Sequence, residues 1–162
     1  MRDLNLLMDF YELTMANGYF VNGKEKTEAV FDVFFRSVPD NGGYAIFAGL
    51  EQVIDYFEKL SFKEEEIKYL KSKKIFDDAF LDYLKEFKFS CDVYAMKEGT
   101  PIFPNEPIMV IKGPIIECQL IETMVLLTIN HQSLIATKAS RIVHAAQGRA
   151  VLEFGARRAH GY

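Results

Sequence analysis

Hydrophobic residues recur along this chain at two spacings, and each spacing predicts one kind of element. From Leu50 they follow at intervals of three and four residues, as on one face of a helix. Runs rich in β-branched and aromatic residues predict strands instead. Helices are predicted after Asp9, from Leu50, after Ser61, after Asp77, after Pro114 and over 131–147. Strands are predicted over 29–35, 90–96, 107–112 and 150–154, with 44–49 as a short strand or a helix lead-in.

Short motifs indicate where the early helices begin and end. A small polar residue followed three positions later by glutamate is typical of a capping box. The pattern occurs at Asp9 with Glu12 and again at Ser61 with Glu64. The Asn-Gly dipeptide at 17–18 is typical of a helix end, so the first helix is expected to stop there.

The pattern changes character at Pro114, which suits a first helical position because it lacks the N–H that a helix start leaves unpaired. The helix that follows is apolar almost all round and is expected to be buried. A second helix, over 131–147, leads into the strand predicted over 150–154. Two helices followed by one strand indicate the opening of an α/β unit, since a single strand cannot stand alone. Two domains are therefore expected, over 1–113 and 114–162.

Composition narrows the kind of protein. The 162 residues are 49% hydrophobic, which is enough for a sizeable core, and the net charge of -4 argues against a nucleic-acid partner, which needs a basic patch. The longest apolar run, around 115–129, is broken by three polar residues and falls short of a membrane span. Cys91 and Cys118 have no metal-ligand spacing and are interpreted as reduced core residues. With no signal segment at the start, a cytoplasmic protein is expected.

Six segments of the chain, in this order, are similar to segments of one enzyme family. They are MDFYELTMANGY, FFRSVPDNGGYAIFAGLEQ, EGTPIFPNEPIMVIKGP, QLIETMVLLTIN, IATKASRIV and EFGARRAHG. Together they resemble nicotinate phosphoribosyltransferase, which joins nicotinic acid to phosphoribosyl pyrophosphate with hydrolysis of ATP. The resemblance extends over nearly the whole chain.

The resemblance implies a sandwich-like α/β domain followed by an incomplete α/β barrel, in a homodimer that builds each active site from both subunits. The expected fold class is accordingly α/β, with an α+β sandwich-like N-terminal domain and only the beginning of the barrel. The family's phosphohistidine and its glycine-rich phosphate loops would lie beyond residue 162. The chain is thus expected to be truncated, with no catalytic residue and no metal ligand of its own, and to show little or no turnover alone.

The implied substrates are nicotinic acid and phosphoribosyl pyrophosphate, with ATP as co-substrate and Mg²⁺ to neutralise the diphosphate. The product would be nicotinate mononucleotide, a precursor of NAD. Two alternatives stay open. The pyridine could instead be nicotinamide or quinolinate, although two adjacent arginines in EFGARRAHG favour nicotinate. The chain could also be a truncated, non-catalytic paralogue that binds or dimerises with a partner.

Nicotinate is a flat pyridine with a carboxylate, so its site needs aromatic faces for the ring and a cation for the carboxylate. A guanidinium can bind both carboxylate oxygens, and stacked rings add stabilisation. By resemblance, Phe154 stacks on the pyridine, and Arg157 lies near its carboxylate with Arg158 adjacent. Tyr11 is implied to cover the other face of the ring from the neighbouring subunit.

Further candidates come from the resemblance in the case of Arg36 and from their place on a helix in the case of Thr14, Lys138 and Arg141. Arg36, at the end of the strand predicted over 29–35, matches a basic residue that faces the phosphate or pyrophosphate across the dimer interface. Thr14 lies three positions after Tyr11, on the same side of the first helix. Lys138 and Arg141 share one helix face and either add positive potential near the diphosphate or hold that helix to a neighbour.

Each candidate also has a purely structural interpretation. Phe154 ends an apolar strand and could belong to the core, and Tyr11 could be half-buried packing on an amphipathic helix. Arg36 could be a solvated strand end. Arg157 and Arg158 could be solvated or form surface ion pairs, which contribute little to stability.

Overall fold

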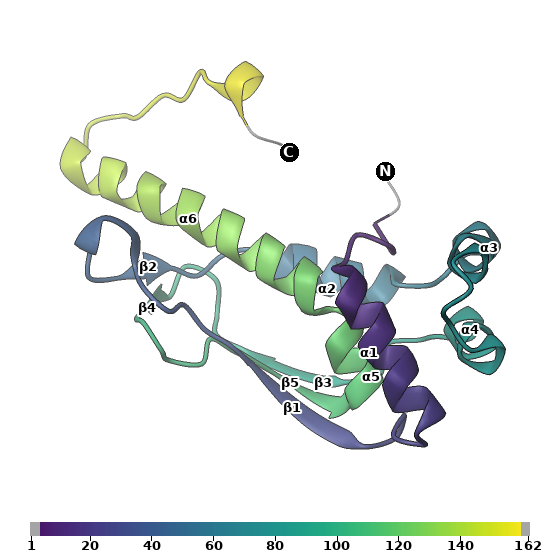
Figure 1. Cartoon of the computed structure of the whole chain (residues 1–162). Helices are drawn as coiled ribbons and strands as arrows, with labels where there is room; N and C mark the ends of the chain where they lie inside the picture. Colours follow the sequence, from purple (N-terminus) through teal and green to yellow (C-terminus); the bar gives the residue numbers. More distant parts are fainter. Residues whose placement is uncertain (1–3, 160–162) are drawn as a thin grey trace.

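A computed structural model of the chain describes residues 4–159, which form both helices and strands (Figure 1). The helices are α1 (Phe10–Val21), α2 (Leu50–Lys59), α3 (Glu64–Ser72), α4 (Asp78–Lys85), α5 (Ile115–Leu120) and α6 (Glu122–Ala146). The strands are β1 (Glu28–Val33), β2 (Ala45–Ile46), β3 (Asp92–Ala95), β4 (Pro101–Ile102) and β5 (Met109–Pro114). Two short 3-10 helices are η1 (Pro39–Asn41) and η2 (Ala156–Arg158). The mixture of helix and sheet agrees with the predicted class.

The larger sheet has β5 at its centre, with β1 and β3 paired to it on either side, both antiparallel. Phe31, Ile111 and Val93 lie side by side across the three strands, and Ile111 is buried in the core. Helix α5 packs against β1 and β5, and α1 packs against α5. On the other face of the sheet Val30 and Tyr94 are exposed. An antiparallel sheet with one buried and one open face explains the alternation along β1.

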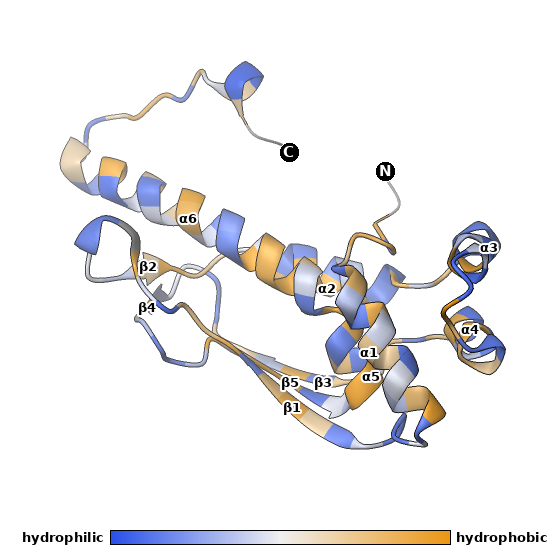
Figure 2. Cartoon of the chain, in the orientation of Figure 1, coloured by the Kyte–Doolittle hydropathy of each residue, from blue (hydrophilic) through white to orange (hydrophobic). Residues whose placement is uncertain are grey.

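The long helix α6 crosses the molecule (Figure 1). It packs against a second, smaller sheet, in which β2 pairs with β4. Hydrophobic and hydrophilic residues follow one another along α6 (Figure 2). Its buried stripe repeats every four residues: Val125, Ile129, Ser133 and Thr137. The two hydroxyls bind backbone that β4 leaves unpaired: Ile46 N–H donates to Thr137 Oγ1 (2.8 Å), and Ala48 N–H donates to Ser133 Oγ (3.1 Å). Polar residues are therefore required in the second half of this stripe, although they are buried.

One turn further along, Arg141 binds the loop before β2. Its guanidinium donates to the Tyr44 carbonyl (3.3 Å) and lies 3.8 Å from the Asp40 carboxylate. The loop passes so close that a β-carbon at Gly42 would lie 1.7 Å from Arg141 Nη2. Lys138 and Arg141 were expected either to add positive potential near the diphosphate or to hold their helix to a neighbour. Arg141 does hold its helix to a neighbouring loop. Lys138 is exposed.

The start of α2 is fixed by a residue from the loop after β3. Glu98 Oε1 accepts hydrogen bonds from the backbone N–H groups of Gly49 (2.6 Å) and Leu50 (2.7 Å). A carboxylate suits this place because the first N–H groups of a helix have no partner within the helix. Gly49 has a φ of 103°, and a β-carbon there would lie 3.1 Å from Gln132 of α6. Glycine therefore serves both the backbone conformation and the close approach.

The strand predicted over 150–154 is wrong. The described residues contain no strand there, and Leu152 and Phe154 are 76% and 84% exposed. An apolar run forms a strand only when another strand accepts its hydrogen bonds, and among residues 4–159 none is placed beside it. The predicted helix boundary at His131 is wrong as well, because α6 runs unbroken through it.

The helix starts are confirmed more often than the motifs that predicted them. Helix α1 begins after Asp9 as predicted, but the Asp9 side chain makes no cap bond, and the helix continues past 17–18 to Val21. The capping box at Ser61 is wrong by two residues, since the Lys63 N–H donates to the side chain of Glu66 (2.7 Å). Asp77 caps α4 as expected and accepts from the Ala79 N–H (2.8 Å).

The two cysteines are free thiols, as predicted, but they lie close together. Their sulfur atoms are 3.8 Å apart, with Cys118 buried and Cys91 half-buried. Cys91 follows Ser90, whose N–H and hydroxyl both donate to the buried carboxylate of Glu117 in α5 (2.5 and 2.9 Å). A β-carbon at Gly113 would meet the Cys91 sulfur at 2.5 Å, so glycine is needed where β5 passes this pair.

Helix α5 follows the predicted domain boundary at 113/114, and it packs against α1, β1 and β5. Within residues 4–159 the first part of the second predicted domain is thus in contact with the first. The position of the boundary stays a prediction.

We expect Thr137→Val to lower the free energy of unfolding by about 1–3 kcal/mol, because the substitution keeps the side-chain volume but leaves the Ile46 N–H without its acceptor. Urea unfolding followed by circular dichroism measures the difference. Ser140→Ala is the matched control, since the Ser140 hydroxyl binds only the carbonyl of Thr137 in the same helix. Equal losses for the two variants would contradict the role given to Thr137.

Candidate functional site

Tyr11 is held at the junction between α1 and the start of α6. Its hydroxyl donates a hydrogen bond to Glu122 Oε1 (3.0 Å), and Glu122 Oε2 accepts a second from the amide of Gln119 (2.8 Å). The ring remains 45% exposed. Partial burial raises the pKa of Tyr11 to about 12, and the hydrogen bond and charge of Glu122 contribute to the increase. The hydroxyl therefore stays protonated at physiological pH and donates to the carboxylate.

Thr123, the next residue of α6, forms hydrogen bonds with the start of α1. The Thr123 hydroxyl donates to Glu12 Oε1 (2.6 Å) and accepts from the Asp9 N–H (3.0 Å), while the Thr123 N–H also donates to Glu12 (3.0 Å). Glu12 thus bonds another helix instead of closing a capping box with Asp9. Residues 122 and 123 together fix the beginning of α1 to the beginning of α6.

Glu12 is a fully buried carboxyl group. Burial raises its pKa from 4.5 to about 7, against the opposing effect of the hydrogen bonds from Thr123. Among the described residues its second oxygen, Oε2, has no hydrogen-bond partner, and the same holds for the buried hydroxyl of Tyr56. The charge of Glu12 is close enough to add to the raised pKa of Tyr56, whose main cause is burial.

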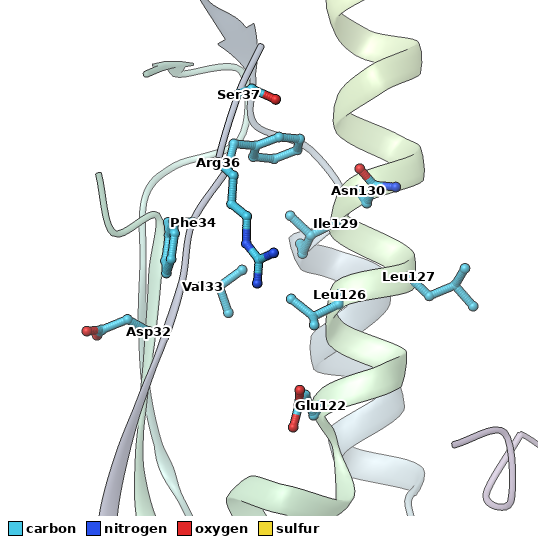
Figure 3. A pocket seen from close by; sticks show the side chains of 11 residues that line it. Asp32, Val33, Phe34, Arg36, Ser37, Glu122, Leu126, Leu127, Ile129 and Asn130 are labelled. Atoms are coloured by element: carbon cyan, nitrogen blue, oxygen red, sulfur yellow. The ribbon is translucent and has the colours of Figure 1, made fainter. Parts of the chain in front are cut away.

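A cavity of about 630 Å³ lies between β1 with the residues that follow it and the first half of α6. Arg36 projects into it, with its guanidinium between the side chains of Val33 and Leu126 (Figure 3). Glu122 lines the same cavity at the start of α6, so the carboxylate that binds Tyr11 also borders the space that Arg36 enters. Of the predicted site residues, Arg36 lines this cavity, and Tyr11 is connected to it through its hydrogen bond with Glu122.

The cavity has a mixed lining, with one arginine, the two carboxylates of Asp32 and Glu122, and apolar side chains. Arg36 is the cation that lines it, and among residues 4–159 no carboxylate lies within ion-pair distance of Arg36. A guanidinium without a protein partner can bind a phosphate or carboxylate through two hydrogen bonds. The other walls are mainly apolar, with Phe34, Leu126 and Ile129 among them.

The remaining predicted residues lie elsewhere. Phe154, Arg157 and Arg158 are all exposed, on the extended segment after α6 and in η2. No described hydrogen bond, ion pair or ring contact joins them to the junction at Tyr11. Thr14 is exposed on α1, and its hydroxyl donates to the Tyr11 carbonyl (3.0 Å) in the preceding turn. Their roles in substrate binding stay predictions.

The carboxylates at this junction were not among the predicted site residues. A signal for Glu122 was present, because it is one of three polar residues that interrupt the apolar run around 115–129. A polar side chain on a buried helix needs a partner, and Glu117, Gln119 and Glu122 all find one: Ser90, Glu122 and Tyr11 in turn. Which partner each would find depends on the register between helices, which the spacing of one segment does not contain.

The fold is of the mixed α/β class, and an arginine enters a cavity between its larger sheet and its long helix. Residues 6–130 match the family model described as the nicotinate phosphoribosyltransferase (NAPRTase) N-terminal domain. The chain is 48% identical to nicotinate phosphoribosyltransferase pncB2 of Mycobacterium tuberculosis and 44% identical to nicotinate phosphoribosyltransferase of Bacillus subtilis, over 96% and 97% of its length. The chain belongs to the nicotinate phosphoribosyltransferase family.

Solved structures agree with this assignment and with the predicted fold class. The crystal structure of human nicotinic acid phosphoribosyltransferase covers 95% of the chain with a TM-score of 0.87 and 34% identity. That of nicotinate-nucleotide pyrophosphorylase from Pyrococcus furiosus covers 96% with a TM-score of 0.74 and 28% identity. The chain spans about a third of the length of these proteins and of the two bacterial relatives (32% of each solved chain, and 34% and 32% of the relatives).

We expect stability to fall as the pH rises through about 7, because the folded protein binds the proton of Glu12 more tightly than the unfolded chain does. This contribution is complete below about pH 4.5 and is lost above the folded pKa of about 7. In Glu12→Gln the oxygen that accepts from Thr123 is kept and the titration is removed, so the dependence on pH between 5 and 8 should flatten. Thermal unfolding at several pH values measures it.

Glu65→Gln is the matched control for this prediction, since Glu65 is exposed in the first turn of α3. It should keep the pH profile of the unsubstituted protein. A Glu12→Gln profile as steep as that of the control would show that Glu12 does not titrate in this range.

Proposed function

We propose that the protein carrying this chain joins nicotinic acid to phosphoribosyl pyrophosphate, forming nicotinate mononucleotide and pyrophosphate with hydrolysis of ATP. The observation that carries the proposal is the 48% identity, over 96% of the chain, to a protein named nicotinate phosphoribosyltransferase. The proposed place in metabolism is the salvage of nicotinic acid for NAD synthesis, in the cytoplasm. Within the described residues no helix is long and apolar enough to cross a membrane.

In the proposed site, aromatic rings hold the pyridine and arginines hold the anions. Phe154 stacks on one face of the ring, and Tyr11 covers the other. Arg157, with Arg158 beside it, binds near the carboxylate. Arg36 binds the phosphate or diphosphate of the second substrate. The exposed Arg36 in its cavity and the exposed ring faces of Tyr11 and Phe154 support these roles.

We further propose a homodimer in which each site combines the two groups of residues from different subunits. Two observations support this arrangement. Glu122 bonds Tyr11 and lines the cavity that Arg36 enters, whereas Phe154 and Arg157 lie on a separate segment. Phe154 is 84% exposed, as expected of a side chain whose partner comes from elsewhere.

The reaction replaces pyrophosphate at the anomeric carbon of the ribose with the pyridine nitrogen. The C–O bond to pyrophosphate breaks and carries its electron pair away, while the nitrogen lone pair forms the new C–N bond. Negative charge leaves and positive charge develops on the sugar, so catalysis rests on alignment of the ring and on electrostatic stabilisation of the diphosphate. Tyr11 and Phe154 would supply the alignment, and Arg36 part of the charge.

The proposal also includes Mg²⁺, as the ion bound to the diphosphate, and ATP, as a co-substrate. Mg²⁺ would neutralise the diphosphate. ATP would drive synthesis through a phosphohistidine located outside this chain. In the described part of the chain no group of three or more His, Cys, Asp or Glu residues could hold a metal ion. We therefore assign no residue of residues 4–159 to the metal.

The test is an assay of the longest natural form of the protein with phosphoribosyl pyrophosphate, ATP and Mg²⁺. Nicotinate, nicotinamide and quinolinate are compared as the pyridine, and the mononucleotide is measured by chromatography. We expect turnover with nicotinate and at least tenfold less with the other two, because the relatives at 48% and 44% identity are named for nicotinate. Preference for another pyridine would reassign the substrate, and no turnover with any would favour the non-catalytic paralogue.

A second prediction concerns the shared site. Arg36→Ala and Arg157→Ala should each reduce turnover strongly when made alone. Co-expression of the two variants should restore about a quarter of the wild-type rate, because half of the randomly formed dimers are mixed and each has one intact site. Differently tagged subunits allow the mixed dimer to be purified and assayed. Sites built within single subunits would give no recovery.

A further inference from the structure

Glu122 has both carboxylate oxygens occupied, each by a different kind of partner. Oε1 accepts from the Tyr11 hydroxyl on α1 (3.0 Å), and Oε2 accepts from the amide of Gln119 (2.8 Å). Gln119 is itself only 3% exposed, so its side chain is held by packing. A carboxylate fixed on one side by a buried amide can orient the group that it binds on the other.

The consequence for Tyr11 is a ring whose direction is fixed although the residue stays partly exposed. A tyrosine that is 45% exposed on a helix surface could otherwise populate several rotamers. Here its hydroxyl is anchored at one end and its Cα is anchored at the other, since Thr123 binds Asp9 and Glu12 on either side of Tyr11. A ring that is already in place when a ligand arrives loses less entropy on stacking.

We infer that Glu122 is a positioning residue that sets the orientation of the Tyr11 ring for stacking on the pyridine. The inference rests on the proposed function, because it assumes that Tyr11 stacks on the substrate. Glu122 also lines the cavity that Arg36 enters (Figure 3), so one side chain aligns the ring and borders the anion site. Its effect on turnover passes through Tyr11 and not through contact with the reacting atoms.

The kinetic test compares Glu122→Ala, Glu122→Gln, Tyr11→Phe and the double variant Tyr11→Phe with Glu122→Ala in the longest natural form of the protein. Tyr11→Phe keeps the ring and removes only the hydroxyl. We expect each single loss of the hydrogen bond to raise the KM for nicotinate by about two- to tenfold. The KM for phosphoribosyl pyrophosphate should change by less than about twofold. Glu106→Ala, in an exposed loop, is the matched control and should leave both constants unchanged.

Two comparisons separate positioning from a general structural effect. The double variant should be no worse than the poorer single variant, because both substitutions break the same bond. Glu122→Gln keeps an oxygen that can accept from Tyr11, so it should recover most of the loss seen in Glu122→Ala. Additive losses, or equal increases in the KM of both substrates, would overturn the inference.

A second measurement does not depend on activity. Acetylation by N-acetylimidazole modifies tyrosine hydroxyls that are free to react, and mass spectrometry of peptides reports each site separately. We expect Glu122→Ala to accelerate modification of Tyr11 at least severalfold, with Glu122→Gln in between. Tyr94, which is 62% exposed, should react at an unchanged rate, and the half-buried Tyr83 should remain slow if the fold is intact.

The outcomes distinguish the inference from the function on which it rests. Wild-type turnover with nicotinate together with unchanged kinetics in Glu122→Ala would overturn the inference and leave the function standing. Absence of wild-type turnover with any pyridine would remove the function, and the acetylation rates would then decide whether Glu122 orients Tyr11. An unchanged acetylation rate at Tyr11 in Glu122→Ala would overturn that orientation directly.

Discussion

The structure depends on hydrogen bonds that side chains of α6 make to backbone far away in the sequence. At the start of the helix, the Thr123 hydroxyl accepts from the Asp9 N–H. In its middle, Ser133 and Thr137 bind the backbone around β2, a strand too short to be held by its single pairing with β4. Buried backbone groups must find partners, and α6 supplies them along one stripe. One helix thereby holds the first helix and the smaller sheet in fixed positions.

The candidate site follows from this arrangement. The turn of α6 that holds α1 also carries Glu122, and the next turns carry Leu126 and Ile129, which form one wall of the cavity. Arg36 enters the cavity from the other side, from the segment after β1. The parts of the site that this chain supplies are thus positioned by α1, α6 and the end of β1, and hydrogen bonds hold α1 to α6.

The sequence was most informative where a pattern depends only on neighbouring residues. The spacing from Leu50 predicted α2, and Asp77 predicted the cap of α4. The strand over 150–154 failed because pairing is a property of two segments, and apolar character alone does not show that a partner strand is present. Tyr11 and Arg36 were found through resemblance. Glu122 was missed because its role depends on which helix packs against it, and one segment of sequence does not show that.

The close approach of Gly42 to Arg141 couples the residue choice at two positions that are ninety-nine residues apart in the sequence. Any side chain at 42 would displace the guanidinium from the Tyr44 carbonyl, unless position 141 became shorter at the same time. The constraint acts in one direction, because a shorter residue at 141 leaves room for glycine and for a larger side chain at 42 alike. In a deep set of related sequences, a side chain at the first position should therefore be found chiefly where the second position is not arginine.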